Sequence, residues 1–289
     1  MDFKINKFER FIIKNRKLLV IITACIFIFA MTSCAIMLIP YGSTILLVLY
    51  WLIIQLFVVV ILKKSNQILE IRNKYLQPEK ALDATNQLIA TTNKKDFQNV
   101  AVFLNNRVAF LIDMGEFEQA ENEILMFLQK FENKRLLPST YIAIHTNLAT
   151  IALEKKDFNA YEEQFKIICR NASETKNKRR KRQIHHMIVS LQQHAEAVVA
   201  NETCDFGDYV TRVWAINHYD PLKNKNLTDE QTLPYSYLVA YENLFIFTQN
   251  TGDTERAKTY AQQIINIANE QFYIYRKAKE YLENGNSSN

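Results

Sequence analysis

Residues 18–62 read LLVIITACIFIFAMTSCAIMLIPYGSTILLVLYWLIIQLFVVVIL, a run of 45 residues that contains no Asp, Glu, Lys or Arg. One membrane crossing needs about 20 apolar residues, because a helix rises about 1.5 Å per residue and the hydrocarbon core is about 30 Å thick. The run is long enough for two crossings, and Pro40-Tyr41-Gly42-Ser43 divides it. We therefore predict two transmembrane helices, over 18–39 and 41–62, because helices satisfy their own backbone hydrogen bonds in lipid.

Basic residues flank this apolar run on both sides. The leader, residues 1–17, carries six Lys or Arg against two acids, and Lys63 and Lys64 follow the second span directly. The turn between the spans has no charge, so the positive-inside rule predicts a multi-pass cell-membrane protein with both termini in the cytoplasm. A cleaved signal peptide is the alternative for the first span. Its apolar run is longer than a signal core, and a second span follows at once.

The side chains in and beside the spans favour a tether. Phe and Ile residues between the cations of the leader predict a short interfacial helix. No Asp, Glu, Lys, Arg or His lies within either span, so no residue is available for a proton or ion pathway. Gln55 is strongly polar and lies deep in the second span, where we expect a hydrogen bond within the hairpin. Contact with a neighbouring subunit is the alternative.

Composition limits what the rest of the chain does. The net charge is +5 in 289 residues, and +4 of it lies in the leader, so residues 63–289 have no general excess of cations for nucleic acid. The four cysteines form no CxxC pair, which argues against a disulfide framework or a zinc site. Only five glycines and five prolines occur, too few for phosphate-binding loops or many tight turns. We expect helices almost throughout and no cofactor.

Similar short segments recur between apolar helical stretches. They are Gly115-Glu116-Phe117-Glu118-Gln119-Ala120, Lys156-Asp157-Phe158-Asn159-Ala160-Tyr161 and Gly252-Asp253-Thr254-Glu255-Arg256-Ala257, with looser matches at Gln77-Pro78-Glu79-Lys80-Ala81 and Cys204-Asp205-Phe206-Gly207-Asp208-Tyr209. These segments resemble the turn of the tetratricopeptide repeat (TPR). The intervals of 39, 41, 48 and 48 residues exceed the 34 of that repeat, which implies longer, divergent hairpins. We expect Asp157, Asp205 and Asp253 to cap the second helices.

The predicted fold is all-α: a transmembrane helical hairpin followed by a TPR-like α-solenoid of about five helical hairpins. The predicted helix pairs are 63–76 with 78–91, 97–114 with 116–132, 139–154 with 157–171, 180–200 with 205–218, and 235–249 with 254–270. A polar insert covers 220–234, and a terminal helix covers 271–283. The domains are therefore a leader (1–17), the spans (18–62), a cytoplasmic helical-repeat domain (63–283) and a disordered tail (284–289). Stacking is needed because one hairpin cannot bury its apolar stripe alone.

Asparagine recurs at one position of this pattern. Nine residues before Gly115, Lys156 and Gly252 stand Asn106, Asn147 and Asn243. In the TPR family, asparagines on the first helices often hold the backbone of an extended peptide, and a carboxamide matches a peptide group with one acceptor and two donors. The resemblance implies that these three residues bind a peptide or protein partner. A role in helix packing is the alternative.

The soluble part contains one dense basic run. We predict that it contacts anionic lipid through Lys178, Arg179, Arg180, Lys181 and Arg182. A solvated turn is the alternative. Nucleic acid is not expected, because no aromatic residues interleave with the charges. His185, His186 and His194 lack the i,i+4 spacing of helical metal ligands. We predict no metal site, no catalytic residues and no enzyme activity, because no nucleophile–base or paired-carboxylate pattern occurs.

These features predict a membrane-anchored cytoplasmic adaptor that binds a protein or extended peptide in the groove of its helical repeats. Its partners would be a cytoplasmic or membrane protein and membrane lipid. A structural subunit of a membrane protein complex and a membrane-tethered sensor of signalling peptides are the alternatives.

Overall fold

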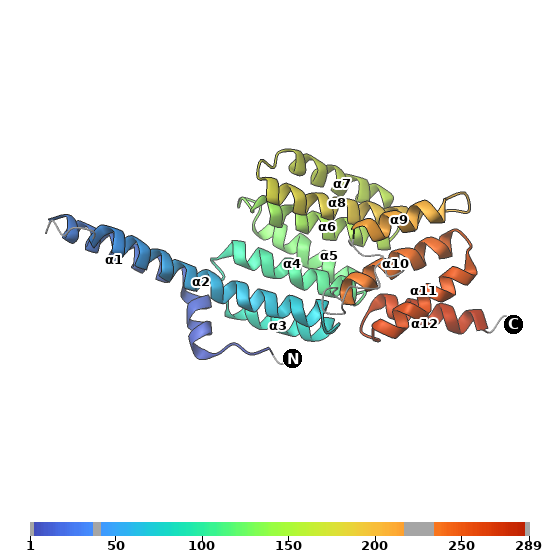
Figure 1. The fold of residues 1–289 in the computed structure, drawn as a ribbon, viewed down its shortest axis with the longest axis horizontal. Helices are drawn as coiled ribbons and strands as arrows, with labels where there is room; N and C mark the ends of the chain where they lie inside the picture. Colours follow the sequence, from blue (N-terminus) through green and yellow to red (C-terminus); the bar gives the residue numbers. More distant parts are fainter. Residues whose placement is uncertain (1–2, 37–41, 217–233, 287–289) are drawn as a thin grey trace.

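The computed structural model of the chain describes residues 3–36, 42–216 and 234–286. Over these residues the protein forms twelve helices and no strand, which confirms the all-α prediction (Figure 1). Their bounds are α1 Lys7–Ile36, α2 Gly42–Asn73, α3 Pro78–Thr91, α4 Phe97–Asp113, α5 Phe117–Lys130, α6 Pro138–Glu154, α7 Phe158–Ser173, α8 Lys178–Val199, α9 Phe206–Ile216, α10 Pro234–Asn250, α11 Thr254–Ile267 and α12 Tyr273–Asn286.

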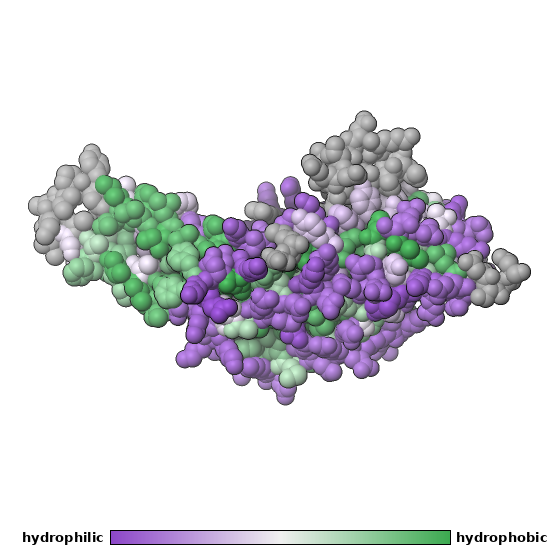
Figure 2. All heavy atoms as spheres, turned by 90° about the horizontal axis from the view of Figure 1, so that it is seen from below, coloured by the Kyte–Doolittle hydropathy of each residue, from purple (hydrophilic) through white to green (hydrophobic). Residues whose placement is uncertain are grey.

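Helices α1 and α2 pack against each other and project from a helical body (Figure 1). Both are long and apolar enough to span a membrane, by length and composition. Large apolar side chains such as Phe29 (76% exposed) and Ile26 (61%) cover their surface, whereas core helices bury such groups. Figure 2 shows the same contrast: apolar atoms gather on the projecting pair, and the visible surface of the body is mostly hydrophilic.

The predicted leader is not a separate helix, because α1 begins at Lys7 and continues without a break into the first span. Phe8 and Phe11 are exposed, as an interfacial helix requires, but Ile13 packs with Ile61 and Leu88 in the core of the body. The start of α1 therefore serves both the anchor and the body. Phe8 and Phe11 are three positions apart and share one face of this helix, whereas Ile13 lies on another face.

The five predicted hairpins occur in the predicted order, with bounds that differ by a few residues. The C-terminal part of α2 pairs with α3. The next pairs along the chain are α4–α5, α6–α7, α8–α9 and α10–α11. The terminal helix α12 reaches Asn286, beyond the predicted 283. The polar insert at 220–234 lies outside the described residues, except that Pro234 begins α10.

Hairpin turns repeat one backbone geometry. Gly115, Lys156 and Gly252 adopt positive φ angles of 79°, 57° and 77°, and each stands two residues before the next helix. The residue that follows each of them donates its N–H to a carbonyl five positions back, the bond that defines a Schellman motif. Asp157, Asp205 and Asp253 accept the backbone N–H three residues on, which confirms their predicted capping role.

The C-terminal helices return to the first hairpins. Arg276 Nη2 donates to the Met114 carbonyl oxygen at 2.7 Å, and Asn269 Nδ2 donates to the Leu76 carbonyl oxygen at 2.7 Å. Helices α4, α6, α8 and α10 contact one another in sequence order, and α12 contacts α4. The row of helices is thus closed by α12, which leaves a cavity rather than an open groove between them.

The two turn glycines offer a matched test of this closure. An added Cβ at Gly115 would lie 2.8 Å from Tyr273 Cδ2, whereas one at Gly252 would meet nothing within 4 Å. We expect Gly252→Ala to lower the free energy of unfolding by about 1 kcal/mol, the cost of a left-handed backbone for an L residue. Gly115→Ala should cost about 1–3 kcal/mol more, because Tyr273 must also shift. Denaturant unfolding of the detergent-solubilised protein measures both, and equal losses would show that Tyr273 does not pack on this turn.

Candidate functional site

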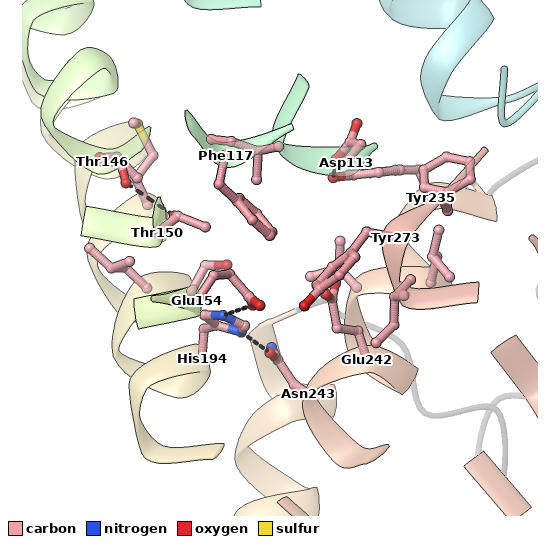
Figure 3. A pocket seen from close by; sticks show the side chains of 18 of the residues that line it. Asp113, Phe117, Thr146, Thr150, Glu154, His194, Tyr235, Glu242, Asn243 and Tyr273 are labelled. Atoms are coloured by element: carbon pink, nitrogen blue, oxygen red, sulfur yellow. Dashed lines mark hydrogen bonds and ion pairs between the residues drawn. The ribbon is translucent and has the colours of Figure 1, made fainter. Parts of the chain in front are cut away.

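The closed row of helices surrounds a cavity of about 500 Å³. It lies between α4, the start of α5, α6, α8, α10 and α12, so its wall combines residues from four hairpins and the terminal helix (Figure 3). A volume of this size falls within the usual range of ligand pockets. Asp113, Glu154 and Glu242 are the acidic residues of the wall. The surroundings of these three carboxylates differ, and the differences determine what the cavity is able to bind.

Asp113, at the end of α4, is fully satisfied. Arg72 of α2 donates to it through Nε at 2.6 Å and through Nη2 at 2.9 Å, and the Tyr235 hydroxyl of α10 donates to it at 2.7 Å. The Arg72 guanidinium also lies 3.6 Å from the centroid of the Tyr235 ring. Burial opposes the charge of Arg72, but Asp113 raises the pKa of the guanidinium above its ordinary value. This carboxylate is therefore committed to holding three helices together.

Glu154, at the end of α6, is paired with two cations. Its carboxylate lies 3.1 Å from His194 Nε2 and 3.2 Å from Lys277 Nζ. The other ring nitrogen of His194, Nδ1, lies 2.9 Å from Asn243 Oδ1 (Figure 3). Burial alone would lower the pKa of His194, but Glu154 raises it to about 9. Burial alone would raise the pKa of Glu154, but His194 and Lys277 lower it to about 2. Both ring nitrogens of His194 then act as donors.

Glu242, on α10, differs from the other two. It makes no hydrogen bond or ion pair with any described residue, and it lines the cavity beside Asn243 and Tyr273 (Figure 3). Burial raises its pKa to about 7, and the charges of Glu154 and Asp113 act in the same direction. The nearby cations His194 and Lys277 offset only part of this shift, since both are already paired with Glu154. Among the described residues, Glu242 is thus the one carboxylate of the cavity that has no cation bonded to it.

Aromatic rings form another part of the wall. Phe117 and Tyr273 pack edge to face with their centroids 5.0 Å apart, and the Tyr235 and Phe272 rings lie 6.4 Å apart. Thr146, Thr150 and Ser190 add hydroxyl groups. Carboxylate and aromatic faces together favour a cationic group. Within the described ranges, no group of three His, Cys, Asp or Glu residues is arranged to hold a metal ion.

The three predicted asparagines do not line one surface. Asn243 is 4% exposed and lies in the cavity wall, where it orients His194. Asn147 donates to Asn105 Oδ1 at 3.0 Å and so joins α6 to α4, the packing role that was the alternative. Asn106 is partly exposed on α4 and does not line the cavity. Peptide binding by all three together remains a prediction, and the structure places only Asn243 at the cavity.

The basic run lies at the start of α8, and His186, the first cavity residue of this helix, follows Arg182 by four positions. Lys178, Arg180, Lys181 and Arg182 are exposed at the start of this helix, and Asn177 caps it by accepting the Arg180 N–H at 3.0 Å. The side chain of Arg179 lies outside the described ones. His194 stands 16 residues after Lys178 on the same helix, a distance of about 24 Å at 1.5 Å per residue. Contact of these residues with lipid remains a prediction.

Sequence reasoning missed the acids and the histidine of the cavity. His194 was interpreted as a structural histidine, and Glu154, Glu242 and Lys277 were not singled out. No local spacing could have revealed them, because Glu154 and Lys277 are 123 positions apart and meet only when α12 folds back. The one available signal is position: Glu154 and Asn243 both lie on first helices of the hairpins, the elements that face inward in the resembling family.

The features above define an all-helical protein with two candidate membrane helices and a repeat-like helical body that encloses an acidic cavity. No family model, curated protein or solved structure matches the chain. The likeness to the TPR family therefore rests on the turn segments and on the arrangement of hairpins alone.

The pairing of Glu154 with His194 predicts a pH-dependent stability. A raised histidine pKa stabilises the fold fully below about pH 6.5 and loses this effect as the pH rises through about 9. A lowered glutamate pKa stabilises it fully above about pH 4.5 and loses the effect as the pH falls through about 2. His194→Gln should therefore cost about 3 kcal/mol between pH 4.5 and 6.5, and progressively less toward pH 10.

Thermal unfolding of both proteins across this pH range measures the difference. The matched control is His185→Gln, the same substitution at an exposed position of α8, which should change stability little at any pH. A His194→Gln deficit that stays constant from pH 5 to pH 10 would mean that His194 is neutral in the folded protein.

Proposed function

We propose that this protein is a membrane-anchored cytoplasmic adaptor whose TPR-like helical body binds a partner protein through a peptide segment with a cationic group. The observation that carries the proposal is the uncompensated carboxylate of Glu242 in an aromatic-lined cavity of about 500 Å³. A Lys or Arg side chain, or a free amino terminus, would supply the missing positive charge. An ion pair formed away from water is stronger than the same pair on the surface.

The other two carboxylates of the cavity support a cationic ligand, because neither is available to compete with Glu242 for it. Asp113 and Glu154 each have their own cations within the fold, so a bound cation need not compete for them. Phe117 and Tyr273 provide ring faces for the aliphatic stem and for the charge itself. The hydroxyl groups of Thr150 and Ser190 and the carboxamide of Asn243 are suited to the backbone of a short peptide. These features favour binding over catalysis, because none of them forms a nucleophile–base pair.

The two membrane helices would confine this binding to the membrane surface. A body held by two spans searches a surface instead of a volume, which raises its effective concentration near other membrane proteins. The basic residues on both flanks of the apolar run support a body on the cytoplasmic side. A partner captured in the cavity would thereby be brought to the membrane.

Binding of model peptides tests the cavity. We expect an acetylated, amidated pentapeptide of alanines with a central lysine to bind at least about tenfold more tightly than the same peptide with norleucine, because a hydrogen bond to a charged group contributes about 1.5–3 kcal/mol. Affinity should rise with pH through about 7, where Glu242 loses its proton. Isothermal titration with the full-length protein in detergent measures both effects.

Glu242→Gln should remove both the preference for lysine and its pH dependence. The control is Glu118→Gln, the same chemical change at an exposed site on α5, which should leave both intact. Equal affinity for the lysine and norleucine peptides in the wild type would contradict a cationic ligand.

The orientation has its own test. Protease added to intact cells should leave residues 63–289 uncut, and protease added to inverted membrane vesicles should digest the loops of the body. The reason is the positive-inside bias of the flanking Lys and Arg residues. Immunoblotting against a C-terminal tag reads out the result. Digestion of the body in intact cells would reverse the orientation and remove the cytoplasmic adaptor.

A further inference from the structure

Three loops lie at the end of the body that faces the projecting pair α1 and α2. They are the α3–α4 loop (92–96), the α5–α6 loop (131–137) and the α7–α8 loop with the first turn of α8 (174–182). Helices α3 to α8 run in alternating directions, so these three loops fall at the same end (Figure 1). We call these segments together the anchor-side loops.

Contacts tie these loops to the base of the anchor and to each other. Lys17, the last residue before the apolar run, donates through Nζ to the Lys95 carbonyl oxygen at 2.9 Å and lies 3.5 Å from Asp96. Gln98, just after the first loop, donates through Nε2 to the Arg135 carbonyl oxygen in the second loop at 2.7 Å. The first loop is therefore level with the start of the apolar run, and the second lies beside it.

The second and third loops border a shared hollow. This hollow has a volume of about 570 Å³, and its wall includes Lys134 and Arg135 from one loop and Lys176 and Arg180 from the other. Phe131 and Ile184 belong to the apolar part of the same wall, and Glu132 and Glu174 also line it. The three loops thus form a continuous row that leads away from the base of the anchor.

Positive charge is concentrated on this row. The three segments carry net charges of +1, +1 and +5, whereas the turns at the opposite end of the body (74–77, 114–116, 155–157, 200–205 and 251–253) range from −2 to +1. The exposed cations of the row are Lys94, Lys95, Lys134, Arg135, Lys176, Lys178, Arg180, Lys181 and Arg182. None of these nine forms a salt bridge to a described acid. Asp96, the acid in the first loop, is already paired with Arg16 and Lys17.

We infer that the anchor-side loops form a second membrane contact, which holds the body against an anionic leaflet of the bilayer that α1 and α2 cross. Unpaired surface cations within a Debye length of anionic headgroups are attracted to them, and Leu137, 46% exposed in the second loop, is placed to enter the interface. The anchor fixes the distance of the row from the bilayer, so the contact needs no further loss of translational freedom.

This contact would also fix where the acidic cavity stands. Helix α6 runs from the second loop toward the cavity, and Glu154 lies 16 residues after Pro138. The α6 residues of the cavity wall, Thr146 to Glu154, therefore lie about 12–24 Å from the contact surface at 1.5 Å per residue. Lipid contact by the anchor-side loops does not depend on what the cavity binds. If this contact were disproved, the proposed adaptor function would still stand.

Hydrogen exchange of the full-length protein in nanodiscs tests the inference. The first backbone N–H groups of α8 have no acceptor within the helix, and of these the Asn177 side chain binds that of Arg180. The others exchange fast unless something covers them. We expect exchange over 131–137 and 174–182 to be at least about fivefold slower in phosphatidylserine–phosphatidylcholine nanodiscs than in phosphatidylcholine nanodiscs. At about 1 M salt, where the Debye length is about 3 Å, the difference should disappear.

A matched pair of variants locates the charges. Replacing Lys178, Arg180, Lys181 and Arg182 by Gln should abolish the protection by the anionic nanodiscs. Replacing Lys74, Lys155, Lys156 and Lys258 by Gln removes the same charge elsewhere and should leave it intact. Equal exchange of the wild type in both kinds of nanodisc would overturn the inference. It would also be overturned if single-stranded RNA, but not phosphatidylserine, protected these segments, since the surface would then serve nucleic acid.

Discussion

Arg72 and Asp113 form the ion pair on which the arrangement of the body depends. Arg72 stands at the end of α2 away from the apolar run, Asp113 ends α4, and Tyr235 at the start of α10 donates to the same carboxylate. Three helices that are distant in sequence are thereby joined at one largely buried point. Breaking such a pair leaves one charge uncompensated, which typically costs about 3–5 kcal/mol. The anchor, the second hairpin and the last hairpin are consequently parts of one structure.

Closure of the row changes the character of its inner face. An open array of hairpins presents an extended groove, whereas here α12 occupies part of the inner space and brings Lys277 to Glu154 and Tyr273 to Phe117. Three carboxylates are concentrated in a small volume, and the fold supplies cations for two of them. The remaining one, Glu242, is held where its charge is costly. Burial therefore favours the neutral form of this carboxyl group.

The two ends of the body have opposite electrostatic character. The end beside the anchor is rich in unpaired cations, whereas the cavity near the other end is acidic. Such a division suits a protein that faces a charged surface on one side and a soluble partner on the other.

The local features of the fold followed from the sequence because their causes are local. The apolar run 18–62, the recurrent turns at Gly115, Lys156 and Gly252, and the caps at Asp157 and Asp253 depend on side chains only a few positions apart, and the structure has helices, turns and caps at those places. Lys156 even adopts the left-handed backbone that glycine adopts in the other two turns. The offset of nine residues that selected Asn243 located one residue of the cavity wall, but the same offset selected Asn147, which pairs with Asn105.

Only the tertiary structure decided that α12 contacts α4, that Glu154 meets both His194 and Lys277, and that Glu242 has no bonded partner among the described residues. The contacts of Glu154 join residues 40 and 123 positions apart, and the Asn269–Leu76 contact joins residues 193 positions apart. Periodicity reports which face of each helix is apolar, but it carries no information about the angle at which successive hairpins stack. That angle accumulates over five hairpins, and it alone determines whether α12 reaches α4 and which charges then face one another.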